Sequence, residues 1–259
     1  MTGNGAAAAV GGDGGAEGRE QGREQGREVG RECIVVALDV PMLPQAAALA
    51  EQLAGEVGWF KVGLELFSAH GPTAVETIRA YGPVFLDAKL HDIPTTVRRA
   101  AARIAELDVG LLTVHAGGGA AMLQAAVEGL GESGELLGVT VLTSMSDADL
   151  ASVQAPPAAQ QVPHLARLAV DAGVPGLVCA PGDLAVVRGT VGPDIRLVTP
   201  GIRPPGGGDD DHARAATPGA AIAAGADLLV VGRPITRADD PVAAARAIAR
   251  DVADALATT

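Results

Sequence analysis

Both lysines of the chain lie in segments whose composition suggests chemistry. The sequence has 259 residues and 19 cationic side chains, and only Lys61 and Lys89 are lysine rather than arginine. A compact ammonium group can donate and accept a proton, whereas a guanidinium group stays charged at any ordinary pH. Because the chain uses arginine almost everywhere else, we expect the two lysines to have a chemical role.

The densest charged cluster is the segment FLDAKLHDIPTTV at 85–97. Asp87 and Lys89 are two residues apart, so an extended strand would project both side chains to the same side. Asp92 follows in the expected loop. Alternating acidic and basic groups are costly to bury unless each is paired, so we interpret the cluster as a preorganised electrostatic site. A set of purely structural salt bridges is the alternative.

A second cluster combines arginines with loops rich in glycine and proline. LVTPGIRPPGGGDDDHARAATP at 197–218 contains Arg203, and VVGRPIT at 230–236 contains Gly232 and Arg233. Guanidinium groups form paired hydrogen bonds with phosphate oxygens, to which a backbone N–H can add. The cluster therefore predicts a phosphate site, with ordinary surface arginines as the alternative, and the long loop is typical of a lid.

Short apolar runs alternate with Ala/Leu/Arg-rich stretches of helical period from Cys33 onward. They predict strands at 33–38, 58–62, 83–88, 110–115, 137–142, 175–179, 195–199 and 227–231. They predict helices at 44–54, 64–80, 94–106, 118–130, 160–172, 182–189, 213–224 and 240–256. Eight strand–helix pairs across 33–259 predict a closed (β/α)8 TIM barrel. A doubly wound open sheet is the alternative, but HAGGGAA at 115–121 lacks its dinucleotide-binding spacing.

A barrel places its active site at the carboxyl ends of its strands. Polar residues follow those ends in chain order, and both lysines are among them: Asp39, Lys61, Asp87, Lys89, His115, Thr143, Ser144, Thr199, Gly232 and Arg233. The order predicts that the charged cluster and the arginines share one mouth of the barrel. For His115, an ordinary core position is favoured over a catalytic role.

The composition excludes several other classes. A formal net charge of −12 argues against general nucleic-acid binding, and no apolar run is long enough for a membrane span. The start carries no secretory signal pattern, so we expect a cytoplasmic protein. Cys33 and Cys179 are expected to be buried thiols, and the five histidines show no zinc spacing. Residues 1–32, with the repeat EGRE-QGRE-QGRE-VGRE, are expected to form a mostly disordered tail.

These motifs together resemble the orotidine 5′-phosphate decarboxylase family. The matching segments run in order through most of the chain: VALDV at 36–40, KVGLELF at 61–67, FLDAKLHDIPTTV, TVHAGGG at 113–119, LTS at 142–144, TPGIRP at 199–204 and GADLLVVGRPIT at 225–236. The resemblance implies decarboxylation of orotidine 5′-monophosphate to uridine 5′-monophosphate, the last step of de novo pyrimidine synthesis, without a metal or organic cofactor.

The resemblance also implies a role for each matching residue. Lys61, Asp87, Lys89 and Asp92 would form a charged tetrad in which Lys89 donates the proton. Asp39, Lys61 and Thr96 would contact the ribose, Thr143 and Ser144 the pyrimidine, and Arg203, Gly232 and Arg233 the phosphate. His212 stands where the family usually has a phosphate-binding glutamine. A homodimer is implied, in which Asp92 and Thr96 reach into the neighbouring subunit's site.

Three other functions fit parts of the pattern. A magnesium-dependent 3-keto-L-gulonate 6-phosphate decarboxylase or hexulose-phosphate synthase would share the D-x-K-x-x-D string. A Schiff-base aldolase would use a strand-end lysine as a neutral amine. A non-catalytic phosphate-binding barrel would leave the Lys/Asp cluster without a purpose.

Overall fold

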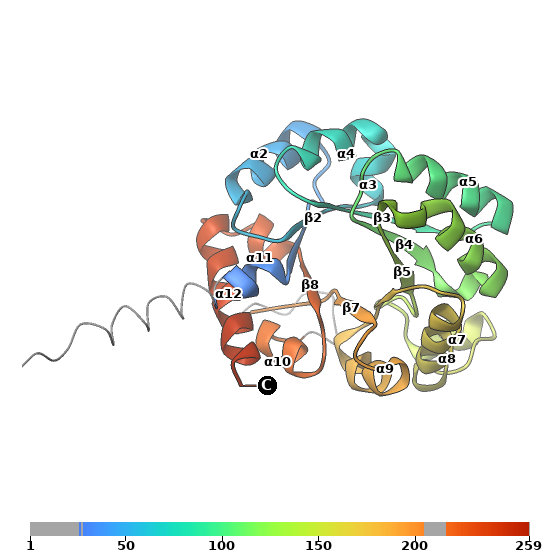
Figure 1. The fold of residues 1–259 in the computed structure, drawn as a ribbon. Helices are drawn as coiled ribbons and strands as arrows, with labels where there is room; N and C mark the ends of the chain where they lie inside the picture. Colours follow the sequence, from blue (N-terminus) through green and yellow to red (C-terminus); the bar gives the residue numbers. More distant parts are fainter. Residues whose placement is uncertain (1–25, 27, 205–215, 259) are drawn as a thin grey trace, which may run out of the picture.

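A closed barrel of eight parallel strands forms the centre of the molecule. The computed structural model describes residue 26, residues 28–204 and residues 216–258. Each strand pairs with the next in chain order, and β8 pairs with β1 to close the barrel. The strands are β1 (Ile34–Ala37), β2 (Trp59–Val62), β3 (Val84–Leu90), β4 (Leu111–His115), β5 (Glu135–Val139), β6 (Gly176–Val178), β7 (Arg196–Thr199) and β8 (Leu228–Val231). The predicted TIM barrel is confirmed (Figure 1).

Helices surround the barrel on its outer side (Figure 1). The α-helices are α2 (Leu43–Leu53), α3 (Leu64–His70), α4 (Pro72–Arg79), α5 (Pro94–Ala105), α6 (Ala120–Leu130), α7 (Asp147–Ser152), α8 (Ala158–Asp171), α9 (Leu184–Val191), α10 (Pro218–Ala223), α11 (Arg233–Thr236) and α12 (Pro241–Leu256). Three short 3-10 helices accompany them, at Ala116–Gly118, Gly131–Ser133 and Pro181–Asp183. Among the residues described here, no helix is both long and apolar enough to cross a bilayer.

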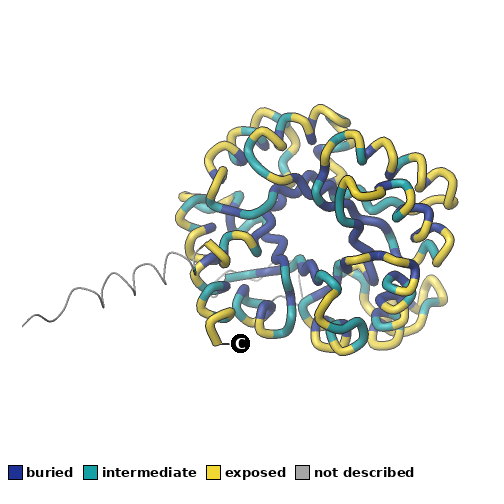
Figure 2. Tube along the Cα trace, viewed as in Figure 1, coloured by how far each residue is buried: buried dark blue, intermediate teal, exposed yellow. Residues whose placement is uncertain are grey.

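The strands are buried on both faces, which explains their continuous apolar runs. One side chain in two points into the barrel, where a small apolar cluster includes Val35, Phe85, Leu111 and Val198. The alternate side chains pack against the helices in a second, much larger cluster. Figure 2 shows the resulting ring of buried strands inside a half-exposed layer of helices.

Several elements differ from the sequence-based expectation. The helix expected at 64–80 is two helices, because Gly71 adopts φ 57° and Pro72 begins α4. The fifth strand begins at Glu135, two residues earlier than expected. The helix expected at 213–224 is described only as α10, since residues 205–215 lie outside the described ranges.

Two helices were not expected. The first is α7, whose start is fixed by a capping box: the Ser146 hydroxyl accepts from the Asp149 N–H, and the Asp149 carboxylate accepts from the Ser146 N–H. The second is α11, a single turn directly after β8.

Part of the segment that was expected to form a disordered tail is regular secondary structure. Residues 28–32 are helical and lie against α12. A Cβ added to Gly30 would stand 2.2 Å from the Ala249 carbonyl oxygen, so this close approach requires glycine. Residues 1–25 and 27 of the expected tail lie outside the described residues.

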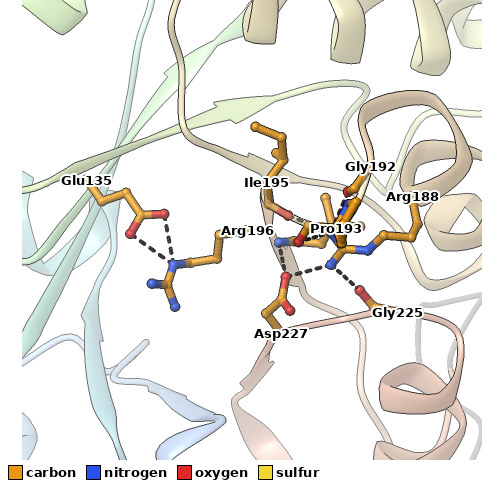
Figure 3. A network of polar contacts seen from close by, with 9 residues as sticks. Glu135, Arg188, Gly192, Pro193, Ile195, Arg196, Gly225 and Asp227 are labelled. Atoms are coloured by element: carbon orange, nitrogen blue, oxygen red, sulfur yellow. Dashed lines mark hydrogen bonds and ion pairs between the residues drawn. The ribbon is translucent and has the colours of Figure 1, made fainter. Parts of the chain in front are cut away.

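A network of charged groups joins the amino ends of β5, β7 and β8 (Figure 3). The Arg188 guanidinium on α9 donates to the Asp227 carboxylate at 2.7 Å and to the carbonyls of Gly192, Pro193, Ile195 and Gly225. Arg196 Nε donates to both carboxylate oxygens of Glu135, at 2.8 and 2.9 Å. Charged groups at this end of a barrel serve stability, because the active site lies at the opposite end.

Candidate active site

A cavity of about 530 Å³ opens at the carboxyl ends of the barrel strands. Its volume falls in the range of pockets that hold small-molecule ligands. The apolar side chains of Ala37, Phe85 and Val230 form its floor. Eight of the residues singled out in the sequence line its wall: Asp39, Lys61, Asp87, Lys89, Thr143, Arg203, Gly232 and Arg233. The structure therefore brings the Lys/Asp cluster and the arginines into one site.

Four charged side chains form an alternating row across this cavity. Lys61 Nζ lies 3.0 Å from Asp39 Oδ1 and 3.5 Å from Asp87 Oδ2. Lys89 Nζ lies 2.8 Å from each carboxylate oxygen of Asp87. The row Asp39–Lys61–Asp87–Lys89 thus spans the ends of β1, β2 and β3, and each ammonium has an acidic neighbour.

The backbone of β3 is not the regular strand that the sequence pattern suggested. The pairing of β3 with β4 shifts register between Leu86 and Leu90, and Lys89 adopts φ 47°. A side chain in this left-handed region costs on the order of 1–3 kcal/mol, and such strain is concentrated at functional sites. The irregularity brings the Lys89 ammonium directly against Asp87.

Thr113 stabilises this strained segment through two hydrogen bonds, and it was not among the residues predicted for the site. The fully buried Thr113 hydroxyl on β4 accepts from the Lys89 backbone N–H and donates to Asp87 Oδ1, both at 2.9 Å. The one available sign was a hydroxyl within the apolar run LLTVH, next to the strand that carries Asp87.

The surroundings of Asp87 keep its carboxylate ionised. Burial opposes the charge, but the positive charges of Lys61 and Lys89 and the hydrogen bonds from Lys89 and Thr113 outweigh it, so the pKa of Asp87 lies below its ordinary value.

His115 lies half-buried at the end of β4, where its ring is 5.3 Å from the ring of His91. Burial and the positive charges of His91 and Lys89 lower the pKa of His115, although Asp87 opposes the shift. A neutral imidazole at this place agrees with a packing role beside the charged row.

The opposite wall of the cavity carries the arginines. Arg203 follows β7, and its backbone N–H donates to the Ala216 carbonyl at 2.9 Å. A bridge between Ile202 and Ala216 joins the two ends of the long loop. His212 belongs to the part of this loop outside the described residues. Gly232 and Arg233 follow β8 and complete this wall.

Three of the expected site residues do not line the cavity. Asp92 and Thr96 are exposed beside it, at the β3–α5 loop and in the first turn of α5. The Asp92 carboxylate accepts from the Ile93 N–H at 2.6 Å, and the Ile93 side chain is 66% exposed. Ser144 is exposed in the segment after β5, next to Thr143.

Further lining residues were not anticipated from the sequence. Pro41 lies between β1 and α2, Gln45 lies in the first turn of α2, and Thr236 and Arg237 come from α11 and the residue that follows it. Nothing in their local sequence patterns distinguished them from ordinary surface residues.

The fold and this cavity define a (β/α)8-barrel enzyme whose site combines an alternating Lys/Asp row with a group of arginines. A family model described as "Orotidine 5'-phosphate decarboxylase / HUMPS family" matches residues 32–248, and the chain belongs to this family. The resemblance seen in the sequence is thereby confirmed.

Several similar sequences and structures are orotidine 5′-phosphate decarboxylases. An orotidine 5′-phosphate decarboxylase of Anaeromyxobacter sp. (strain K) is 54% identical over 219 residues, covering 83% of this chain and 96% of that protein. One from Thermobifida fusca is 53% identical over 222 residues, covering 85% of this chain and 95% of that protein. The crystal structure of orotidine 5′-phosphate decarboxylase from Lactobacillus acidophilus matches with a TM-score of 0.75 and 37% identity, over 85% of this chain and 98% of that one.

Proposed function

We propose that this protein decarboxylates orotidine 5′-monophosphate to uridine 5′-monophosphate and CO2, the last step of de novo pyrimidine synthesis. The observation that carries the proposal is the pairing of Lys89 Nζ with both Asp87 oxygens at 2.8 Å, in the same cavity as Arg203 and Arg233. This arrangement offers a fixed ammonium at one end and a phosphate-binding wall at the other.

The ammonium is suited to the electronic problem of the reaction. When the bond between C6 of the pyrimidine and its carboxyl carbon breaks, the electron pair remains on C6 and CO2 leaves. Lys89 Nζ stabilises this negative charge and then transfers a proton to C6, which leaves the lysine as a neutral amine. Arginine could provide the charge but not the proton, because its guanidinium is not deprotonated in proteins.

The remaining site residues bind and orient the substrate. Arg203, Gly232 and Arg233 hold the phosphate, Asp39 and Lys61 contact the ribose, and Thr143 lies beside the pyrimidine. Ser144, which is next to Thr143 but outside the cavity lining, would approach the pyrimidine from the exposed segment after β5. Because the phosphate is remote from C6, its binding energy can hold the base against the charged row without taking part in bond breaking. No metal or organic cofactor is needed in this scheme. His212, which lies outside the described residues, would add a hydrogen bond to the phosphate.

Asp92 and Thr96 act in the site of a partner subunit in this proposal. Both side chains are exposed, and neither lines the cavity of its own subunit. The Ile93 side chain, which lies between them in the sequence, is also exposed. A cytoplasmic homodimer in which each subunit supplies these two residues to the other would complete the charged tetrad.

The test is a spectrophotometric assay for loss of orotidine 5′-monophosphate with a metal chelator present. We expect turnover that the chelator does not change. Turnover of a sugar phosphate that the chelator abolishes would instead identify a magnesium-dependent relative. Borohydride trapping of a lysine with a carbonyl substrate would identify a Schiff-base aldolase, whose nucleophile is a neutral amine. In this structure each of the two lysines forms an ion pair with a carboxylate instead.

A further inference from the structure

Arg237 is a cation of the active-site cavity to which no role has been assigned. It follows α11 directly, and its backbone N–H donates to the Arg233 carbonyl at 3.1 Å. Residues four apart in helical geometry lie on the same face, so Arg237 stands one turn beyond Arg233 along the same wall. Both side chains line the cavity.

The Arg237 side chain has no structural task among the residues that the structure describes. Within residues 28–204 and 216–258 its guanidinium makes no hydrogen bond or ion pair. The acidic Asp240 nearby in sequence is occupied, since its carboxylate accepts from the Ala243 N–H at 2.9 Å and caps α12. An arginine that lines a cavity without contributing to the fold is available to a ligand.

The charges of the cavity lining also point to a ligand rather than to the fold. The described lining residues include five cations, Lys61, Lys89, Arg203, Arg233 and Arg237, against the two carboxylates Asp39 and Asp87. Their formal sum is +3 in a chain whose overall charge is −12. A local positive cavity in an acidic protein concentrates anionic ligands and raises their rate of association.

We infer that Arg237 is a further binding residue, whose guanidinium engages the phosphate monoester of the nucleotide beside Arg233. The inference rests on the proposed function, which supplies a substrate with one phosphate dianion and one carboxylate. That substrate is an anion, and Arg237 adds a further cation to the wall that carries Arg233. Its action is on binding and capture, because it is on the wall that is remote from Lys89.

The experiment compares Arg237→Gln with Arg250→Gln. Arg250 is an equally exposed arginine on α12 that lines a separate hollow with Glu28 and Arg31 and likewise makes no side-chain hydrogen bond among the described residues. For Arg237→Gln we expect KM to rise about three- to tenfold while kcat stays within about twofold. Arg250→Gln should leave both unchanged.

Binding of the product nucleotide and of its nucleoside, measured by calorimetry, separates a phosphate contact from any other. Arg237→Gln should weaken uridine 5′-monophosphate by the same three- to tenfold but leave uridine unchanged, and added salt should shrink the difference. Arg237→Lys, which keeps the charge, should recover most of the loss.

The inference is overturned if Arg237→Gln matches Arg250→Gln in nucleotide affinity, or if uridine weakens as much as the nucleotide. The proposed function is decided separately, by whether the wild-type protein converts orotidine 5′-monophosphate. The calorimetric comparison gives its answer in either case.

Discussion

Replacing Thr113 by valine tests whether the Lys89 ammonium is held in place by the fold. The substitution keeps the shape of the side chain and removes its hydroxyl, which accepts from the Lys89 N–H and donates to Asp87 Oδ1. Thr113 is fully buried, so water cannot replace either bond. Leaving a buried polar group unpaired costs about 1–3 kcal/mol, and here one backbone donor and one carboxylate oxygen lose a partner.

We therefore expect Thr113→Val to lower the free energy of unfolding by about 2–3 kcal/mol. In a domain of this size each kcal/mol lowers Tm by about 2–4 °C, which gives a drop of about 5–10 °C. Because Lys89 also holds a left-handed backbone conformation, it should relax when this support is lost. A small displacement of the ammonium from C6 should lower kcat about 10- to 100-fold.

Thr140→Val is the matched control for this experiment. Thr140 is also buried, just after β5, and its hydroxyl donates to the Val178 carbonyl at 3.1 Å rather than to Asp87 or Lys89. That carbonyl keeps the Thr140 backbone N–H as a partner, so the control should lose only about 1 kcal/mol and leave kcat within about twofold. Thermal melts and steady-state rates for both variants decide the matter. Equal kcat in the two variants would refute the positioning role of Thr113.

Two further predictions concern the frame around the site. Arg188→Met should lower the free energy of unfolding by about 2 kcal/mol or more, because its hydrogen bonds are lost. It should leave kcat/KM unchanged, because the network lies at the amino end of the barrel. A loss of activity as large as the loss of stability would contradict a purely structural role for this network. Burial raises the pKa of Cys179 from 9.0 to about 12, so the folded protein keeps a proton that the unfolded chain releases, and stability should fall as pH rises from about 9 to 12. Burial also raises the pKa of Cys33, so Cys179→Ala should flatten this slope in chemical denaturation without abolishing it, and an unchanged slope would contradict the assignment to Cys179. A thiol reagent should label the half-buried Cys33 before Cys179.

The architecture was predictable because its two periods are plain in the sequence. Apolar runs such as CIVVAL at 33–38 are too short for helices and too continuous for half-exposed strands, which is what a buried parallel sheet requires. The position of Lys61 and of the Asp87–Lys89 pair at strand ends then followed, because a barrel gathers the carboxyl ends of all its strands at one mouth.

Two features that the sequence-based expectation did not include have clear local signals in the sequence. The Gly71–Pro72 pair is a strong break, and it divides the helix that was expected at 64–80. Ser146 and Asp149 have the spacing of a capping box, which would have indicated α7.

The remaining features depend on contacts between distant parts of the chain. The bond from Lys89 to Thr113 joins residues 24 positions apart, and it supports a backbone conformation that no local pattern announces. The sequence does not distinguish Gly30 from the other glycines of the repeat. Its role becomes apparent only from the close approach of α12 in the structure. That the Arg237 guanidinium makes no hydrogen bond or ion pair among the described residues depends on its three-dimensional surroundings and cannot be inferred from the local sequence.

The most direct test of the central claim is the turnover of Lys89→Ala and Lys89→Arg, measured alongside their affinity for uridine 5′-monophosphate. If a fixed ammonium stabilises the carbanion and then protonates it, both variants should lose turnover by several orders of magnitude. Nucleotide affinity should fall far less, since the phosphate wall is intact. Lys89→Arg should fail although it restores the charge, because it cannot release the proton. Turnover near the wild-type rate in either variant would contradict the account.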